Sequence, residues 1–153
     1  MNLQLRISNE CMTFIANEID KYPEVETGGV FFGTFYEDFI KIEKVIDGGD
    51  KAIRERFQFR ADKHYVDMQI DMIHANTHLR YIGEWHSHPQ EIPFPSEQDL
   101  ESLEEIAEDC NRPTLMMIFG FINFRIETMI EQSIVVLKAP GNHEFFSIPL
   151  IEE

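Results

Sequence analysis

The chain has 153 residues, 43% of them hydrophobic, which fits one globular domain over residues 1–153 with a single core. Its 28 acidic and 13 basic residues give a formal net charge of -15, which excludes a basic surface for nucleic acid. The sequence holds no apolar stretch of about twenty residues and no basic leader before an apolar run, so we expect no membrane span, no signal peptide and a cytoplasmic location.

The N-terminal part is predicted to hold a strand, a helix and two further strands joined by a turn at 36–38. Their ranges are Leu3 to Ile7, Glu10 to Lys21, Gly29 to Phe35 and Phe39 to Ile46. The segment Glu26-Thr27-Gly28-Gly29 comes just before the continuous apolar run of a buried strand. Glu26 is therefore either an ordinary exposed residue beside Glu24 or a carboxylate held at a site, and this segment alone leaves both interpretations open.

Two histidines lie near the end of the next predicted strand. A helix predicted over Ala61 to Asn76 leads into this strand, Tyr81 to Ser87. Side chains two apart on a strand point to the same side, so His86 and His88 can face one metal ion together. Glu84 shares that side, either as an acceptor for a histidine N–H or as a buried hydrogen-bonded group.

A proline-rich loop connects the histidine strand to a capped helix. The segment Pro89 to Pro95 holds three prolines and ends at Ser96, the expected N-cap of the acidic helix Glu97 to Asp109. From the first turn, Asp99 can reach back as a third ligand and leave the fourth tetrahedral position to water, as catalytic zinc sites require. The alternative is a plain capping box after a rigid turn.

The C-terminal part is predicted to add four strands, so the alternation of helices and strands indicates a mixed sheet of the α/β class. The ranges are Thr114 to Phe121, Arg125 to Ile130, Ser133 to Lys138 and Glu144 to Pro149. Trp85 is expected in the core, and Cys11 and Cys110 are expected to be buried free thiols. No role is assigned to the remaining histidines, which are His64, His74, His78 and His143.

Taken together, Glu26, His86-Ser87-His88-Pro89, Ser96 and Asp99 resemble the JAMM motif of the JAB/MPN metalloprotease family. The seven residues between His88 and Ser96, the two between Ser96 and Asp99, and the Glu-x-Gly-Gly segment before an apolar strand all match the family pattern. The resemblance spans nearly the whole chain. It implies a single JAB/MPN catalytic domain over 1–153, with a mixed β-sheet flanked by helices in the cytidine deaminase-like arrangement.

The resemblance also implies a role for each residue that matches the motif. His86, His88 and Asp99 would bind Zn2+, Glu26 would act as general base on a water, and Ser96 would stabilise the oxyanion. The reaction it implies is hydrolysis of an amide or isopeptide bond without a covalent acyl-enzyme.

Within the family, the compact form with Gly-Glu-Trp-His-Ser-His-Pro and the preceding Phe59-Arg60-Ala61-Asp62 is similar to bacterial stand-alone members. Some of those lie in anti-phage (CBASS) operons beside ubiquitin-activating and ubiquitin-conjugating homologues. The partner implied is a ubiquitin-like protein or its conjugate, such as a nucleotidyltransferase modified by those enzymes. An acidic protein suits a modifier with an arginine-containing tail.

Two other classes of function stay open at this point. One is a non-catalytic MPN-type scaffold or binding module, as in relatives that lose metal ligands, although every ligand position is filled here. The other is a JAMM hydrolase that processes a sulfur-carrier protein or another small substrate, because substrate choice lies in flanking loops and not in the motif.

Overall fold

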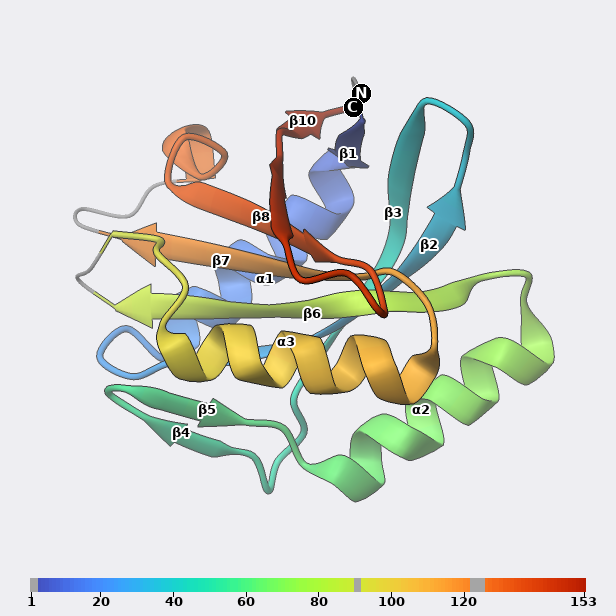
Figure 1. Ribbon diagram of the computed structural model, residues 1–153. Helices are drawn as coiled ribbons and strands as arrows, with labels where there is room; N and C mark the ends of the chain where they lie inside the picture. Colours follow the sequence, from blue (N-terminus) through green and yellow to red (C-terminus); the bar gives the residue numbers. More distant parts are fainter. Residues whose placement is uncertain (1–2, 90–91, 122–125) are drawn as a thin grey trace.

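An eight-stranded mixed sheet forms the centre of the computed structural model, which describes residues 3–89, 92–121 and 126–153 (Figure 1). The strand order is β10-β1-β3-β2-β6-β7-β8-β9, and β4 and β5 form a separate hairpin. The strands are β1 (Gln4–Ile7), β2 (Gly28–Phe35), β3 (Phe39–Asp47), β4 (Ile53–Glu55), β5 (Gln58–Arg60), β6 (Arg80–Pro89), β7 (Thr114–Phe121), β8 (Ser133–Lys138), β9 (Phe145–Ile148) and β10 (Leu150–Glu152). The predicted α/β class with a mixed sheet is confirmed.

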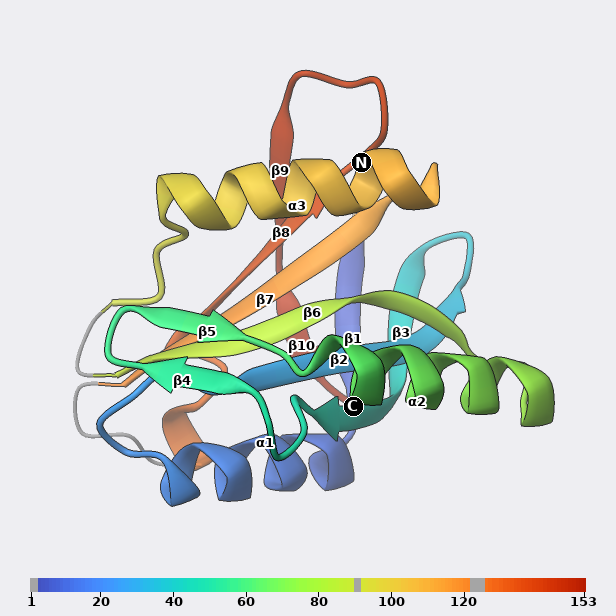
Figure 2. The ribbon, with the colours of Figure 1, turned by 90° about the horizontal axis from the view of Figure 1, so that it is seen from below.

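Helices cover both faces of this sheet. They are α1 (Asn9–Lys21), α2 (Lys63–Asn76) and α3 (Glu97–Cys110), with the short 3-10 helix η1 (Ile126–Thr128). Figure 2 shows α1 and α3 on opposite sides of the sheet. Each of the three α-helices begins at a residue whose side chain accepts a backbone N–H, and these N-caps are Ser8, Asp62 and Ser96. In the described ranges, no helix combines the length and apolar character needed to cross a membrane.

The central strand β2 is apolar at every position of its first half because both of its faces are covered. Val30 and Phe32 pack with the apolar face of α2, whereas Phe31 packs into the larger cluster on the side of α1. On β7, Met117 likewise packs on the side of α1, whereas Met116 packs on the opposite face with α3. A strand buried on both faces needs no alternation, which explains the continuous apolar runs in the sequence.

Gly28, which opens β2 beside β6, has no room for a side chain. Gly28 is paired with His86, and a Cβ at this glycine would lie 2.2 Å from the Trp85 carbonyl oxygen and 2.9 Å from the His86 Cβ. The antiparallel register continues beyond the strand, because the Ser87 N–H donates to the Thr27 carbonyl at 2.9 Å. Glu26 therefore comes level with His88, although 62 positions separate them in the sequence.

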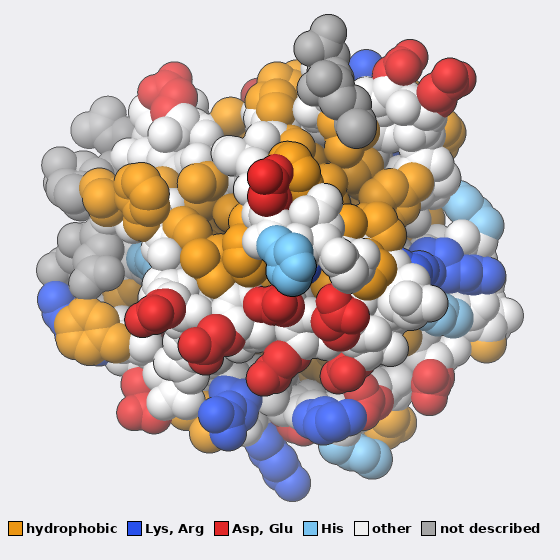
Figure 3. Space-filling model, viewed as in Figure 1, with side chains coloured by type: hydrophobic (Ala, Val, Ile, Leu, Met, Phe, Trp, Pro, Cys, Tyr) orange, Lys and Arg blue, Asp and Glu red, His pale blue; other side chains and the backbone are white. Residues whose placement is uncertain are grey.

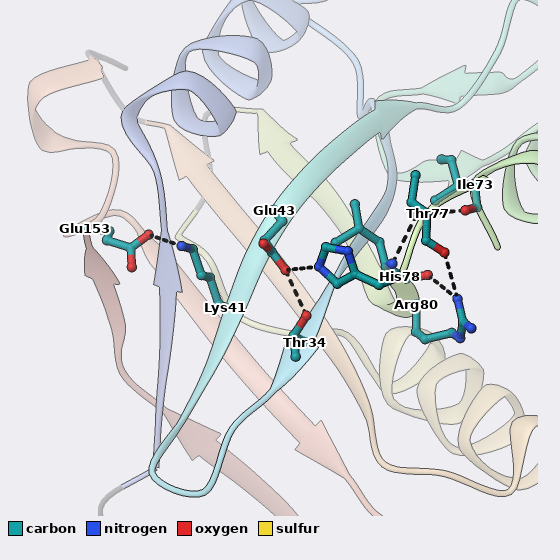
Figure 4. A network of polar contacts seen from close by, with 9 residues as sticks. Thr34, Lys41, Glu43, Ile73, Thr77, His78, Arg80 and Glu153 are labelled. Carbon is teal, nitrogen blue, oxygen red and sulfur yellow. Dashed lines mark hydrogen bonds and ion pairs between the residues drawn. The ribbon is translucent and has the colours of Figure 1, made fainter. Parts of the chain in front are cut away.

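Polar contacts fix the connection between α2 and β6 (Figure 4). The Thr77 N–H and hydroxyl both donate to the Ile73 carbonyl, at 3.0 and 2.8 Å. His78 Nε2 lies 3.8 Å from the Glu43 carboxylate on β3, which also accepts a 2.8 Å hydrogen bond from the Thr34 hydroxyl on β2. The segment before the histidine strand is thereby attached to β3, whose Glu43 is itself hydrogen-bonded to the adjacent strand β2.

Three expectations about the chain need correction. The described part of the predicted strand Arg125 to Ile130 is the 3-10 helix η1 and a turn, and residue 125 lies outside the described residues. Ile126, Met129 and Ile130 pack against the main core at helical spacing, which favours a helical turn over a strand. The strands β4, β5 and β10 were not predicted. Cys11 is buried as expected, but Cys110 is exposed at the end of α3.

The close approach at Gly28 generates a prediction about stability. Gly28→Ala should push β2 away from β6 and lower the free energy of unfolding by about 1–3 kcal/mol, the usual range for an overpacked site. Urea unfolding of the metal-free protein measures the change. An unchanged unfolding midpoint would show that the two strands have room for a side chain and would contradict the close packing.

Candidate metal centre

Two buried imidazoles meet at the C-terminal end of β6. His86 and His88 are each 6% exposed, and their Nε2 atoms lie 3.0 Å apart. The strand is paired on both sides, with β2 and with β7, so its end is held by two neighbours. Since both side chains leave the same face of a paired strand, their spacing is set by the backbone.

Asp99 reaches the same point from the first turn of α3. Its Oδ2 lies 3.4 Å from Nε2 of both His86 and His88. The carboxylate also accepts a 2.9 Å hydrogen bond from the Ser96 N–H, while the Asp99 N–H donates to Ser96 Oγ at 3.0 Å. The two interpretations of Ser96 and Asp99 are therefore compatible, because a complete capping box aims its carboxylate at the histidines.

The electrostatics of Asp99 favour its ionised form. Burial alone would raise the pKa of this carboxyl, but hydrogen bonds with His86 and His88 and the one from the Ser96 backbone hold its pKa well below the usual range. A carboxylate that stays charged beside two imidazoles is a suitable ligand for a divalent cation.

The spacing of these three donors fits a tetrahedral metal. Two ligand atoms about 2.0–2.1 Å from a zinc ion and at the tetrahedral angle lie about 3.3–3.4 Å apart. The three distances among the His86, His88 and Asp99 donor atoms are 3.0, 3.4 and 3.4 Å. The triangle they form therefore has the size of one face of a zinc coordination tetrahedron.

Glu26 is the second carboxylate at this position. Its side chain is 8% exposed, and Glu26, His86 and His88 offer ligand atoms that all lie within 4.8 Å of one another. Its backbone N–H donates to the Glu55 carbonyl on the β4–β5 hairpin at 2.8 Å. Glu26 is thus buried and held from two sides, and the interpretation of it as an ordinary exposed residue is wrong.

A small cavity of about 60 Å³ opens onto these groups. Glu26, His86, Ser96 and Asp99 line it, together with Phe57, Gln58 and Phe59 of the hairpin and Gln98 and Ser102 of α3. The cavity is roomy enough for a few waters. The hairpin was missed as an element, although the charged and then aromatic segment from Lys51 to Phe59 was the signal in the sequence that marked it.

Glu84 does not act as a partner of the histidines. Among the described residues it forms no hydrogen bond with His86 or His88. It lines two larger cavities instead, one between α3 and the β4–β5 hairpin and one between α3 and α2. Burial, with a smaller contribution from the Asp99 charge, raises the pKa of Glu84 to about 7. Trp85 points the other way, is fully buried and donates to the Ile46 carbonyl at 3.1 Å, as expected for a core residue.

The other histidines take no part in this centre. His74 Nε2 accepts a 3.1 Å hydrogen bond from the Tyr81 N–H, which lies toward the opposite end of β6. His64, His78 and His143 are likewise absent from the metal-binding cluster found among the described residues.

Comparison with known proteins gives a consistent picture. A profile of the family described as prokaryotic homologues of the JAB domain matches residues 9–135. A probable metalloprotease of Sinorhizobium fredii is 33% identical over 112 residues, which cover 67% of this chain and 68% of that protein. Two proteins named CD-NTase/cGAS isopeptidase are also similar. The one from Escherichia coli is 29% identical over 76% of each chain, and the one from Vibrio cholerae is 32% identical over 74% of this chain and 73% of its own.

A solved structure supports the fold. The solution structure of a protein from Desulfitobacterium hafniense superposes with a TM-score of 0.71 over 98% of this chain and 93% of its own. The two sequences are 15% identical, so the similarity concerns the arrangement of helices and strands.

The raised pKa of Glu84 predicts a pH dependence of stability in the metal-free protein. The folded state keeps this proton up to about pH 7, whereas the unfolded state loses it near the ordinary value of 4.5. Between these values the folded state binds more protons, so the free energy of unfolding falls as the pH rises. Glu84→Gln should therefore be more stable than wild type at pH 8, by at most about 3 kcal/mol, and the difference should disappear below pH 4.5.

Urea unfolding of both proteins at pH 4 and pH 8 measures this difference. A stability difference that is the same at the two pH values would show that Glu84 titrates normally and would contradict the prediction.

Proposed function

The chain belongs to the family of prokaryotic homologues of the JAB domain, and on this premise we propose that it is a zinc-dependent isopeptidase or peptidase. Its substrate would be the amide bond that follows the C-terminus of a ubiquitin-like modifier. The observation that carries the proposal is the meeting of two imidazoles and Asp99 at the spacing of a zinc tetrahedron, with a second buried carboxylate beside them. A scaffold has no need of this complete set.

His86, His88 and Asp99 would hold the metal. Zinc bound there supplies a Lewis acid that polarises a carbonyl and brings the pKa of a water to about 7. Asp99 suits the role of ligand because its oxygen is 3.4 Å from both imidazole nitrogens and Ser96 fixes its orientation. Its low pKa keeps it charged across the neutral range.

Glu26 would act as the general base and Ser96 as the oxyanion donor. Glu26 lines the same cavity as His86 and Asp99, so its carboxylate can take a proton from a water there and pass it to the leaving amine. Ser96 Oγ already accepts the Asp99 N–H, which leaves the hydroxyl hydrogen to donate into the cavity. A donor fixed in advance in this way stabilises charge that develops on the substrate oxygen.

A groove beside the cavity would hold the tail of the modifier. Its walls are β5 and α3, it joins the small cavity through Gln58 and Ser102, and Glu84 lies on its floor. Tyr81, Glu84 and His86 of β6 line three neighbouring cavities, which share residues such as Arg60, Gln58 and Ser102, and the stretch from Tyr81 to His86 is about 17 Å long, the length of about five extended residues. β5 is paired only with β4 among the described strands, so its other edge can pair with an extended tail.

The charge along this groove suits a tail with basic residues. Figure 3 shows acidic side chains gathered over α3. Exposed acidic residues on this helix are Glu97, Glu101, Glu104, Glu105, Glu108 and Asp109. The opposite wall carries Arg60 and Lys63, and Lys63 is paired with Asp67. With a net charge of -15, the protein as a whole would attract a modifier with an arginine-containing tail.

The names of two relatives support an isopeptidase linked to a nucleotidyltransferase. Two relatives that cover about three quarters of this chain are named CD-NTase/cGAS isopeptidase. We propose that this chain removes a ubiquitin-like conjugate, with a modified nucleotidyltransferase of an anti-phage signalling system as its target, and that it works in the cytoplasm.

Zinc content and hydrolysis of a ubiquitin-like fusion test the assignments together. Glu26→Gln should bind about one zinc per chain and lose hydrolysis, because it removes the proton acceptor and keeps the ligands. His88→Ala should lose the metal as well as the activity. Release of zinc by Glu26→Gln would make Glu26 a ligand. Wild-type protein that binds zinc but cleaves neither a modifier fusion nor a modified nucleotidyltransferase would contradict the proposed substrate.

Ser96 can be tested separately from its role as a helix cap. Ser96→Ala should lower kcat by roughly a hundredfold through loss of the oxyanion donor, whereas loss of a cap alone costs only about 1 kcal/mol of stability. Ser96→Thr keeps the hydroxyl and should retain most of the turnover. If both variants hydrolyse the substrate at the wild-type rate, Ser96 acts only as a helix N-cap and not as an oxyanion donor.

A further inference from the structure

We propose that Arg54, on the β4–β5 hairpin, is a positioning residue for Glu26 and acts through Thr27. The inference rests on the proposed function, in which Glu26 takes the proton. In this proposal the hairpin lines the cavity and also holds the base in place.

Arg54 contacts Thr27, the residue that follows the proposed base Glu26. Its Nε–H donates to Thr27 Oγ1 at 2.9 Å, and its Nη2 donates to the Gly49 carbonyl at 3.2 Å. The guanidinium carbon lies 4.3 Å from the centroid of the Tyr22 ring. One planar group thereby joins the hairpin, the end of α1 and the residue after Glu26.

The backbone of the hairpin holds Glu26 itself. The Glu26 N–H donates to the carbonyl of Glu55, the residue after Arg54, at 2.8 Å. The Phe59 ring packs against the start of β2, since a Cβ at Gly28 would lie 2.9 Å from it. Glu26 lies just before β2, where these contacts from the hairpin restrict its backbone.

Thr27 connects the hairpin to the metal ligands. Its N–H donates a hydrogen bond to Ser87 Oγ at 3.1 Å, and its carbonyl accepts one from the Ser87 N–H at 2.9 Å. Ser87 stands between His86 and His88. Thr27 is fully buried, so its hydroxyl depends on Arg54 for a charged donor. A chain of contacts therefore runs from Arg54 through Thr27 to the strand that bears the ligands.

This arrangement gives a specific expectation for catalysis. A base that is displaced by about 1 Å can lose up to a hundredfold in rate without any change in the chemistry of its carboxylate. The described contacts of Arg54 are with Thr27, Gly49 and Tyr22, and none of these residues is a proposed metal ligand. Loss of Arg54 should therefore leave metal binding intact. The effect should fall on kcat more than on KM.

The experiment compares Arg54→Lys and Thr27→Val, singly and together, with Arg56→Lys as a matched control. Lysine keeps the charge of Arg54 but not its Nε–H, and valine replaces the Thr27 hydroxyl with a methyl group of similar size. Arg56 is exposed on the same hairpin, and its described ring contact is with Phe57. The first readout is hydrogen exchange of the Glu26 amide in the metal-free protein, measured by NMR, with the Phe31 amide of β2 as internal reference.

Both single variants should exchange the Glu26 amide about tenfold faster than wild type, with the Phe31 amide unchanged. In the zinc-loaded protein, kcat should fall about tenfold, with KM and zinc content within about twofold of wild type. The double variant should be no worse than either single one, because both break the same contact. Arg56→Lys should match wild type in every measurement.

A Glu26 amide that exchanges at the wild-type rate in both variants would overturn the proposal, and so would equal acceleration of the Glu26 and Phe31 amides, which indicates global destabilisation. The proposed function fails by a different result, namely hydrolysis that is absent in wild type or unaffected by Glu26→Gln. Because the exchange readout needs neither metal nor substrate, it tests the contact through Arg54 in either case.

Discussion

The antiparallel register between β2 and β6 is the constraint on which the site depends. Gly28 lies opposite His86 with no space for a side chain between the strands, and the Thr27–Ser87 backbone bond extends the pairing beyond β2. A slip of one residue would turn every side chain of β6 to the other face. Both histidines would then enter the core, and Trp85 would leave it, so burial of that ring and assembly of the metal centre specify the same register.

The start of α3 serves two purposes with one set of atoms. Ser96 and Asp99 satisfy each other's backbone N–H groups as a capping box, and the same Asp99 carboxylate faces both imidazoles. Because the cap fixes the rotamer of the carboxylate, the ligand is oriented before any metal arrives. The cost of holding a charge there is reduced by the two histidines and the Ser96 N–H.

Much of this could be predicted from the sequence, since apolar runs, caps and the spacing of two histidines on a strand are local patterns. The α/β class and the principal helices follow from them. The strand β10 could not be predicted with the same success, because its partner β1 is distant in sequence. The strands β4 and β5 and the helix η1 span three residues each, which is too short for a periodic pattern. Glu84 shows the limit of periodicity, since it shares a strand face with the histidines yet points into a neighbouring groove. The extent of the single domain and the roles of the site residues stay predictions.

The central claim is that His86, His88 and Asp99 bind one zinc ion while Glu26 stands beside it as a base. Two carboxylates lie close to the same pair of imidazoles, so the choice of ligand is the decisive point. The direct measurement is anomalous diffraction at the zinc edge from crystals of the zinc-loaded protein. We predict one peak about 2.0–2.2 Å from both Nε2 atoms and from an Asp99 oxygen, with the Glu26 carboxylate outside bonding distance. A peak bonded to Glu26 in place of Asp99, or located away from the two histidines, would contradict the account.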